Sequence, residues 1–298
     1  MRFQGFPGRA SMPDVVLQNG TRFTCKPAIS ILDNALANGI SLEHSCKTGQ
    51  CGVCASRVMA GNTEVLKSEI SLNAQQREQG FVLTCCRAAT TDLQLDSEDL
   101  PELQGLTVKT CPARIDAIDY LNSSVIRVVL RTPPNNSLQF LPGQYISVIG
   151  PNSLRRSYSV ANAPRADNKI ELHIKKVEGG AFSQYWFEQA KVNDLLRFEG
   201  PLGTFFVRSP APKKLLLLAT GTGLAPVKSI LEQFIQIDAA KRPEIHVYWG
   251  NRNDSDIYTD LHDLAGPNVQ GHLLLSRPGP EWTGRTGYVQ QAILEDEH

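Results

Sequence analysis

The hydrophobic pattern of the first part of the chain predicts a mixed domain of strands and short helices. Two extended runs between residues 15 and 24 meet at Asn19-Gly20, the strongest short signal for a β-hairpin. Beyond them, Ser30 precedes an apolar helical face and predicts the N-cap of a helix. The acidic, proline-containing segment 97–102 predicts a linker. We therefore expect a first domain over residues 12–98.

The next part of the chain has the period of β-strands. Residues 125–130 are β-branched and aliphatic, and residues 169–175 alternate between polar and apolar positions. Turn signals rich in proline and glycine separate these runs, and only a short segment near Ala181 has helical character. An antiparallel barrel closes such strands and removes their edges. We expect this barrel over residues 106–210.

The last part has the pattern of a nucleotide-binding domain. Residues 213–219 form a nearly continuous apolar run, which predicts a strand buried on both faces. A glycine-containing turn follows, and apolar residues then recur at helical spacing from Val227 to Phe234. Strand, glycine turn and helix in this order place free amide groups where a pyrophosphate binds. The predicted fold class is multidomain, α+β and α/β, with a Rossmann-like domain over residues 211–298.

Composition narrows the range of partners. Lys plus Arg and Asp plus Glu number 30 each among 298 residues, so no basic field favours nucleic acid. Residues 1–10 lack the apolar region of a signal peptide, and the apolar run 215–219 is far too short to span a membrane. Seven cysteines, most of them in the motif described next, fit a reducing compartment. We expect a cytoplasmic protein that binds neither nucleic acid nor membrane.

Cysteine spacing carries the chemistry of the first domain. Cys46, Cys51 and Cys54 are separated by four and two residues, and Cys85 follows downstream. This C-x4-C-x2-C…C spacing is the one that holds a plant-type [2Fe–2S] cluster. Zinc and disulfides are the alternatives, but zinc knuckles space their cysteines as two separate close pairs, which these three do not form. The spacing therefore predicts an iron–sulfur cluster.

On this motif the first domain resembles a plant-type ferredoxin. The resemblance implies a β-grasp fold with the cluster near its surface. It also implies that the metal ligands are Cys46, Cys51, Cys54 and Cys85. Cys86 competes for the fourth position, and the L-T-C pattern of the family favours Cys85.

The second domain resembles the FAD-binding barrel of the ferredoxin–NADP reductase superfamily. Residues 156–159, Arg-Ser-Tyr-Ser, match the R-x-Y-[ST] motif of that family. Because side chains alternate along a strand, Arg156 and Tyr158 point the same way. The resemblance implies that Arg156 binds the FAD pyrophosphate, that the Tyr158 ring lies on the isoalloxazine, and that the Ser159 hydroxyl lies near flavin N5. It makes Tyr158 and Ser159 the catalytic residues.

Two further segments carry the same resemblance. Gly180 and Ser183 match the G-x-x-S segment of the family, a glycine turn that opens a helix whose amides can cradle phosphate. His173 and Lys175 lie on the preceding strand and match the segment that lines the dinucleotide. By itself, His173 is more often a hydrogen-bonded histidine of the barrel than a catalyst.

The glycine turn of the third domain resembles the G-T-G-x-A-P turn with which the same superfamily binds a nicotinamide dinucleotide. The residues that the resemblance assigns to this cofactor are Thr220, Gly221, Thr222, Gly223, Pro226, Arg252, Ser276 and Arg277. Arg285 and Tyr288 match positions that surround the adenosine ribose in relatives. Arginines there favour the 2′-phosphate of NADPH, whereas related sequences with this pattern use NADH, so the resemblance leaves both open.

The chain departs from the family at its C-terminal end. Relatives continue with another strand and helix and with a C-G-x-P segment that walls the nicotinamide, whereas this sequence ends at His298. We therefore expect a nucleotide-binding domain that lacks its last elements, and slow hydride transfer in consequence. The alternative is that the incomplete nucleotide-binding domain makes the protein a non-enzymatic electron shuttle.

Together the resemblances cover nearly the whole chain and imply a reductase. Electrons would pass from NADH or NADPH through FAD and the cluster to a protein acceptor, because a flavin exchanges both electron pairs and single electrons. Segments 248–252, 276–278 and 284–289 resemble most the reductases that serve a pyridoxamine-dependent sugar dehydratase in 3,6-dideoxyhexose synthesis. The reductase components of bacterial aromatic and alkane oxygenases share the domain order and are the alternative.

Overall fold

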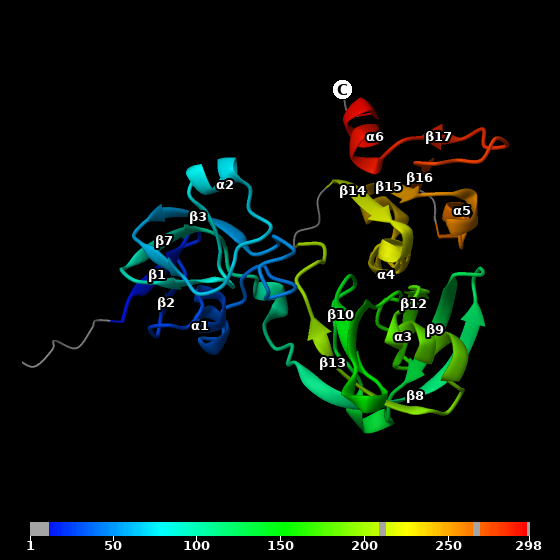
Figure 1. Ribbon diagram of the computed structural model, residues 1–298, viewed down its shortest axis with the longest axis horizontal. Coiled ribbons are helices and arrows are strands. Elements are labelled where there is room, and N and C mark those ends of the chain that lie inside the picture. Colours follow the sequence, from blue (N-terminus) through cyan, green and yellow to red (C-terminus); the bar gives the residue numbers. More distant parts are fainter. Residues whose placement is uncertain (1–11, 209–212, 265–268, 297–298) are drawn as a thin grey trace, which may run out of the picture. The chain divides into compact units, whose positions relative to one another are not determined.

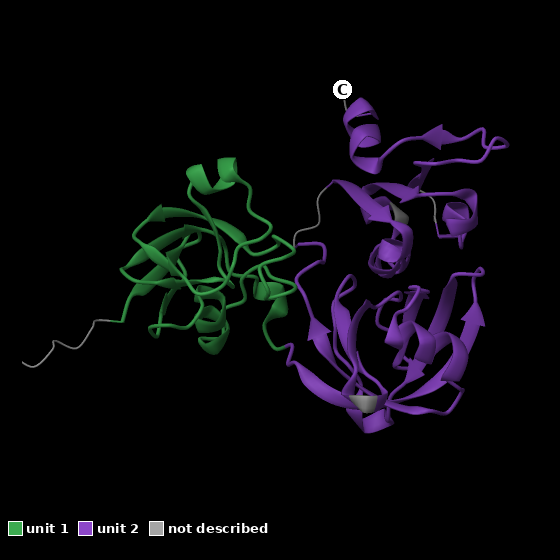
Figure 2. Ribbon diagram, viewed as in Figure 1, with its two compact units in different colours: residues 1–105 green, residues 106–298 purple. Residues whose placement is uncertain are grey.

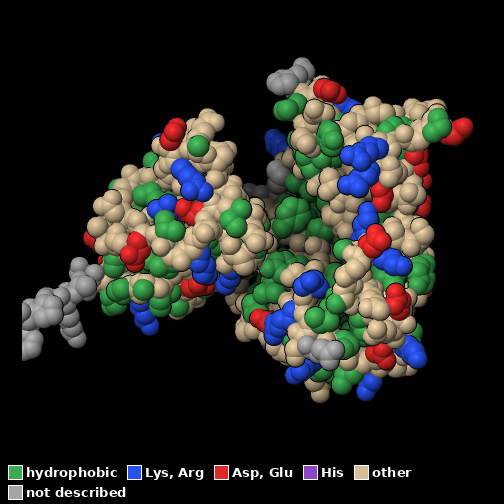
Figure 3. All heavy atoms as spheres, viewed as in Figure 1, with side chains coloured by type: hydrophobic (Ala, Val, Ile, Leu, Met, Phe, Trp, Pro, Cys, Tyr) green, Lys and Arg blue, Asp and Glu red, His purple; other side chains and the backbone are tan. Residues whose placement is uncertain are grey.

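The computed structural model describes residues 12–208, 213–264 and 269–296. The chain divides into two units, residues 1–105 and residues 106–298, which Figure 2 colours separately. On the face seen in Figure 3, basic and acidic side chains are interspersed over both units, in keeping with the balanced composition. Within the described ranges, no helix is both long and apolar enough to cross a membrane.

The first unit packs a sheet on one short helix. Its elements are β1 (Asp14–Leu17), β2 (Arg22–Thr24), α1 (Ile31–Ala37), β3 (Ala55–Ala60), β4 (Thr63–Val65), α2 (Ala74–Glu78), β5 (Phe81–Leu83), β6 (Arg87–Ala89), β7 (Leu93–Asp96) and the 3₁₀ turn η1 (Pro101–Leu103). Five strands pair in the order β2-β1-β7-β3-β5, with β1 and β7 parallel (Figure 1). β4 and β6 form a separate antiparallel pair.

Local signals set the start of this unit as predicted. β1 and β2 form the expected antiparallel hairpin around Asn19-Gly20. The Ser30 Oγ accepts the Asp33 N–H at 3.0 Å, so Ser30 caps α1. The apolar face of α1 then packs with Val15, Leu17 and Leu95 of the sheet. The cysteine segment lies between α1 and β3, held at both ends by this core.

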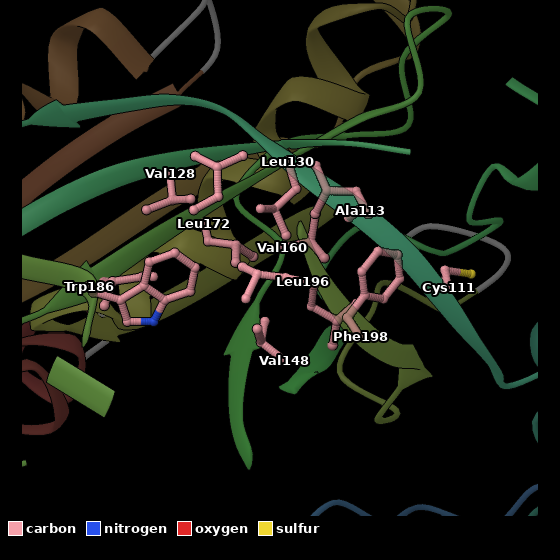
Figure 4. Packing of buried hydrophobic residues seen from close by; sticks show 14 of the residues in the cluster. Cys111, Ala113, Val128, Leu130, Val148, Val160, Leu172, Trp186, Leu196 and Phe198 are labelled. Carbon is pink, nitrogen blue, oxygen red and sulfur yellow. The ribbon is translucent and has the colours of Figure 1, made fainter. Parts of the chain in front are cut away.

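The second unit opens with an antiparallel barrel. Its elements are β8 (Lys109–Tyr120), β9 (Val125–Arg131), η2 (Pro134–Asn136), β10 (Tyr145–Ile149), η3 (Pro151–Ser153), β11 (Arg155–Ser159), β12 (Lys169–Lys175), α3 (Ala181–Gln184), the π-helical turn η4 (Tyr185–Gln189) and β13 (Leu195–Leu202). Six strands pair in the order β11-β10-β13-β8-β9-β12. A bridge between Val160 and Leu172 brings the two ends together, so the sheet nearly closes. Figure 4 shows Trp186 and Phe198 among the aliphatic side chains of the core.

Both faces of β12 are buried along most of the strand. Ile170, Leu172 and Ile174 face the barrel core as expected. Glu171 and His173, on the opposite face, are also buried, with 4% and 8% of their surface exposed. Their face is covered by the nucleotide-binding half of the same unit instead of by water. The period-2 pattern identified the strand correctly, but it does not show what covers the polar face of that strand.

The rest of the second unit is a parallel sheet flanked by helices. Its elements are β14 (Lys214–Thr220), η5 (Gly221–Gly223), α4 (Leu224–Ile235), η6 (Ala239–Lys241), β15 (Glu244–Asn251), η7 (Asp254–Asp256), α5 (Leu261–Leu264), β16 (Val269–Leu275), β17 (Arg285–Thr286) and α6 (Val289–Asp296). The strands pair in parallel in the order β14-β15-β16-β17. Figure 1 shows α4 between this sheet and the barrel.

β14 corrects one expectation. The apolar run 213–219 predicts burial on both faces, yet Leu218 is 40% exposed, whereas Leu217 and Ala219 are buried. β14 is the edge strand of the described sheet, and only one of its faces packs against Val227, Ile230 and Leu231 of α4. β15, which lies between β14 and β16, is the strand that is buried on both faces, from Ile245 to Asn251.

Candidate functional site

The cysteine loop between α1 and β3 is shaped by left-handed backbone positions. Lys47, Gly49 and Gly52 all have positive φ, at 57°, 80° and 76°. A Cβ on Gly49 would collide with the Ser68 carbonyl oxygen and lie 2.9 Å from the Cys86 sulfur. Only glycine fits there, because the loop turns tightly and segment 68–71 packs against it.

The four predicted ligands lie as two pairs. The Cys54 and Cys85 sulfurs are 3.3 Å apart, and Cys46 is hydrogen-bonded to Cys51. Thiolates that share one tetrahedral metal with bonds of about 2.3 Å lie about 3.8 Å apart, close to the first separation. In the described ranges no three His, Cys, Asp or Glu side chains converge on one point as ligands of a single ion. Two pairs are what a two-iron cluster with two thiolates on each iron requires, so these residues fit the group.

The thiols differ in how readily they ionise. Burial raises the pKa of Cys46, but hydrogen bonds from Thr48 and Cys51 outweigh it and lower the value to about 6. Burial raises the pKa of Cys54 to about 12. Metal binding therefore has to displace a proton from Cys54, whereas Cys46 presents a thiolate near neutral pH.

The rival fourth cysteine is placed differently. Cys85 lies beside Cys54, whereas the Cys86 sulfur lies 3.5 Å from Cys85 and 3.7 Å from the Ser68 carbonyl oxygen. Burial raises the pKa of Cys86 to about 12. Cys85 as the fourth ligand stays a prediction, and the two sulfurs differ in that the Cys85 sulfur contacts Cys54.

The predicted flavin motif lies on β11. Arg156 is exposed, and its guanidinium donates to the neighbouring Arg155 carbonyl at 3.0 Å, which leaves most of its donors available. The Tyr158 ring packs against Phe182 and Trp186, and its hydroxyl accepts the Trp186 Nε1–H at 3.1 Å. Burial raises the pKa of Tyr158 to about 12, so it stays a neutral phenol. Ser159, the last residue of β11, is half-buried.

The companion residues of this motif are largely engaged within the fold. The Ser183 Oγ accepts the Val177 N–H at 2.9 Å and so fixes the turn from Val177 to Gly180, the N-cap of α3. His173 lies between Glu171 and Tyr258, with its Nε2 3.0 Å from Glu171 Oε1 and its Nδ1 3.2 Å from the Tyr258 hydroxyl. His173 is thus a buried histidine with both ring nitrogens occupied, the alternative that the sequence left open.

A charged network around Glu171 was not predicted from the sequence. Lys228 of α4 donates to Glu171 at 3.0 Å and to Glu232 at 2.6 Å. Arg127 of β9 lies 3.2 Å from the second oxygen of Glu171. Burial raises the pKa of Glu171, but the hydrogen bond from His173 and the charge of Lys228 outweigh it and hold that pKa well below its usual range. The network joins the barrel to the first helix of the nucleotide-binding half.

A cavity of ≈ 510 Å³ opens at the carboxyl ends of β14 and β15, where ligands of parallel α/β sheets bind. Six of the predicted cofactor residues line it, namely Lys175, Thr220, Gly221, Thr222, Arg252 and Ser276. Gly223, Pro226 and Arg277 do not. The Trp249 indole donates to the Gly221 carbonyl at 2.9 Å and so fixes the glycine turn.

The basic side chains in and near this cavity differ in whether they already form ion pairs. Lys175 is paired with Asp256 at 2.7 Å. Arg252 lines the cavity and has no ion pair among the described residues. Arg285 is held by Glu295 and Asp296, both at 2.7 Å, and does not line the cavity. Of these three cations, Arg252 is the one left to meet a phosphate.

Asn251 is a cavity residue that motif reasoning missed. It is 6% exposed, and neither its amide nitrogen nor its amide oxygen has a partner within the part of the chain that the structure describes. A buried amide of this kind needs one acceptor and one donor from outside the chain. Ribose hydroxyls and carboxamides offer both, whereas a phosphate only accepts, so the cavity fits a nucleotide with more than phosphate contacts. Its place at the end of a parallel strand was the signal available in the sequence.

Three family models match the chain in succession. Residues 15–90 match the 2Fe-2S iron-sulfur cluster binding domain, residues 112–207 the oxidoreductase FAD-binding domain, and residues 217–298 the oxidoreductase NAD-binding domain.

Curated relatives extend over nearly the whole chain. The CDP-6-deoxy-L-threo-D-glycero-4-hexulose-3-dehydrase reductase of Yersinia pestis is 40% identical over 281 residues, which cover 93% of this chain and 84% of that protein. Protein RfbI of Salmonella typhimurium is 40% identical over 288 residues, 94% of this chain and 83% of that protein. The phenol hydroxylase P5 protein of Acinetobacter pittii is 33% identical over 288 residues, 93% of this chain and 80% of that protein.

Solved structures share the fold. The Amycolatopsis cytochrome P450 reductase GcoB matches with a TM-score of 0.67 at 27% identity, over 95% of this chain and 86% of that one. A ferredoxin reductase in carbazole 1,9a-dioxygenase matches with a TM-score of 0.63 at 26% identity, over 94% of this chain and 84% of that one.

Proposed function

The chain belongs to the iron–sulfur flavoprotein reductases of the ferredoxin–NADP reductase superfamily, and from this we propose that its electron acceptor is a pyridoxamine-dependent sugar dehydratase. It would then act as a CDP-6-deoxy-Δ3,4-glucoseen reductase in 3,6-dideoxyhexose synthesis. One observation carries this choice. Identity to the hexulose-dehydrase reductases is 40% over 93% of the chain, against 33% over the same share for the phenol hydroxylase protein.

The cofactors supply the electron chemistry: a nicotinamide gives a hydride, FAD splits the electron pair, and the cluster carries single electrons onward. The chain supplies the sites. In this proposal Cys46, Cys51, Cys54 and Cys85 hold the cluster. Arg156 binds the FAD pyrophosphate, and Tyr158 and Ser159 lie at the flavin ring.

Nucleotide binding follows from the cavity. The turn 220–223 offers backbone amides to the pyrophosphate at the start of α4, and Arg252 adds a charge-assisted contact. Asn251 pairs with a donor-and-acceptor group such as a ribose hydroxyl. Lys175 already has Asp256 as its counter-ion, so it contributes more to the position of η7 than to net charge. We propose NADH as the electron donor. The single positive charge of Arg252 is too little to balance the negative charges of both a pyrophosphate and the 2′-phosphate that NADPH carries.

The runner-up is a reductase component of an oxygenase. Relatives named for terephthalate 1,2-dioxygenase and for naphthalene 1,2-dioxygenase/salicylate 5-hydroxylase are 34% and 32% identical over 79% and 90% of the chain. Both are named as reductase components, so reductase activity by itself does not separate the two proposals. Only the protein acceptor does.

A reconstituted assay tests the acceptor. The purified protein, loaded with cluster and FAD, is mixed anaerobically with NADH, the pyridoxamine-dependent dehydratase and its CDP-4-keto-6-deoxyhexose substrate. We expect deoxygenated sugar in amounts that depend on the reductase. Product from a phenol hydroxylase oxygenase component, with none from the dehydratase, would favour the runner-up. Failure of NADH to bleach the flavin at all would instead support an electron shuttle without reductase activity.

A further inference from the structure

One hydroxyl beside the cysteine loop is buried without a partner. The Ser71 Oγ is shielded from solvent and makes no hydrogen bond to any residue in the described ranges. Burying a polar atom without a partner costs about 1–3 kcal/mol, and native proteins contain few such atoms. The surroundings of this hydroxyl therefore indicate what it binds.

Ser71 touches the cysteine loop at two points. Its backbone N–H donates to the Gly49 carbonyl at 3.1 Å. Its side chain lies over Gly52, because a Cβ built on that glycine would be 3.3 Å from the Ser71 Oγ and 3.5 Å from the Ser71 Cβ. Gly52 directly follows Cys51 and precedes Cys54 by two positions. The unpartnered hydroxyl thus lies against the backbone that joins two predicted ligands.

A second buried serine in the same unit shows what a purely structural hydroxyl looks like. Ser56 on β3 is 2% exposed, and its Oγ donates to the Asp96 carbonyl at 3.3 Å. That bond joins β3 to β7 and offsets the cost of burial. The Ser71 Oγ makes no comparable bond to any described residue, although the Gly49 carbonyl lies close enough to accept the Ser71 backbone N–H.

We propose that the Ser71 hydroxyl donates a hydrogen bond to a sulfur of the [2Fe–2S] cluster and raises the reduction potential of that cluster. The inference rests on the proposed ligand set of Cys46, Cys51, Cys54 and Cys85. Thiolate and sulfide sulfurs become more negative when the cluster takes an electron, so a donor hydrogen bond stabilises the reduced form more than the oxidised form. Ser71 thereby favours transfer from the flavin to the cluster.

The test compares reduction potentials in the full chain loaded with cluster and FAD. In Ser71→Ala we expect the equilibrium constant for one-electron reduction of the cluster to fall about tenfold, equivalent to 59 mV for one electron. An anaerobic spectroelectrochemical titration measures this shift, and the FAD potential in the same protein serves as the internal reference. The matched control, Ser56→Ala, removes a buried hydroxyl from the same unit and should leave the cluster potential unchanged.

A second pair of variants covers the case in which Ser71→Ala assembles no cluster. Ser71→Thr keeps a hydroxyl and Ser71→Val has nearly the same volume without one. The proposal expects the wild-type potential in the threonine variant and a lowered potential in the valine variant. Equal potentials in the two, or loss of the cluster from both, overturn it. An alanine variant with an intact cluster at the wild-type potential also overturns it and leaves the ligand set standing, whereas a wild-type protein without a [2Fe–2S] spectrum refutes the ligand set itself.

Discussion

At the residue scale, mutation can decide which of the neighbouring residues Cys85 and Cys86 is the fourth cluster ligand. We expect Cys51→Ser and Cys85→Ser to bleach or shift the [2Fe–2S] absorbance, because each removes a thiolate from a ligand pair. Cys86→Ser should leave the spectrum as it is, since the Cys86 sulfur faces the Ser68 carbonyl. Cys111→Ser is the control, a buried thiol of the barrel in the other unit. A bleached Cys86 variant beside an intact Cys85 variant would exchange the two roles.

Arg156 tests the flavin motif with a single charge. Within the described ranges its guanidinium has only the Arg155 carbonyl as a hydrogen-bond partner, so Arg156→Ala should remove a phosphate contact and little else. We expect FAD affinity to fall by about 1.5–3 kcal/mol, or roughly ten- to a hundredfold. Flavin content after extensive dialysis measures the loss. Arg197→Ala is the control and should retain FAD, because Arg197 lies on β13, which β10 separates from β11 in the sheet.

Replacing Asn251 should affect thermal stability and nucleotide binding in opposite directions. Asn251→Leu removes two buried polar atoms that have no partner in the described chain, so thermal stability should rise or stay equal. Nucleotide binding should weaken by about 1–3 kcal/mol, the value of two lost hydrogen bonds. Differential scanning fluorimetry and anaerobic NADH titration measure the two. Loss of stability with unchanged NADH affinity would show that Asn251 stabilises the fold and does not bind the nucleotide.

At the element scale, the network around Glu171 fastens α4 to β12. Glu171→Gln leaves Lys228 with Glu232 and Arg127 with Asp119 as remaining partners, so we expect a loss of stability of about 1.5–3 kcal/mol, the value of a hydrogen bond to a charged group. We expect slower flavin reduction by NADH with little change in NADH affinity, because α4 carries the nucleotide turn and its position relative to the barrel is what loosens. Glu199→Gln, which breaks an exposed pair with Arg155, should change stability by less than about 1 kcal/mol.

The Glu171 carboxylate should make the stability of the protein depend on pH. The pKa of Glu171 is lower in the folded protein than its ordinary value of 4.5, so it contributes stability that is complete above that value. The contribution is lost progressively as the pH falls below 4.5 toward the folded pKa. Urea unfolding from pH 7 to pH 3 should therefore show a decline that Glu171→Gln lacks. Equal slopes in both proteins would assign the acid sensitivity to other carboxylates.

At the scale of the whole molecule, the sequence predicted what is local and missed what is tertiary. The hairpin at Asn19-Gly20, the Ser30 cap and the barrel strands depend on neighbouring residues, and the structure confirms them. The environment of Glu171 depends on α4, which lies more than fifty residues downstream, so alternation alone could not show what covers that side chain. Asn251 lies in the family-like segment 248–252, but that resemblance assigned it no role. That its amide has no partner among the described residues becomes visible only when the cavity around it is built.

The division into two units predicts that the two halves of the electron path can be separated. The cysteine loop lies within residues 1–105, and the flavin motif and nucleotide cavity lie within residues 106–298. A Cys46→Ala/Cys51→Ala protein should therefore lose its cluster and keep its FAD. NADH should reduce the flavin at the wild-type rate, and the protein should still reduce ferricyanide. Product formation with the protein acceptor should fall at least a hundredfold, because the carrier of single electrons is gone. Stopped-flow absorbance and the reconstituted assay measure these on one preparation. Sustained product formation without the cluster would mean that electrons leave from the flavin directly, and slowed flavin reduction would mean that the two units do not act independently.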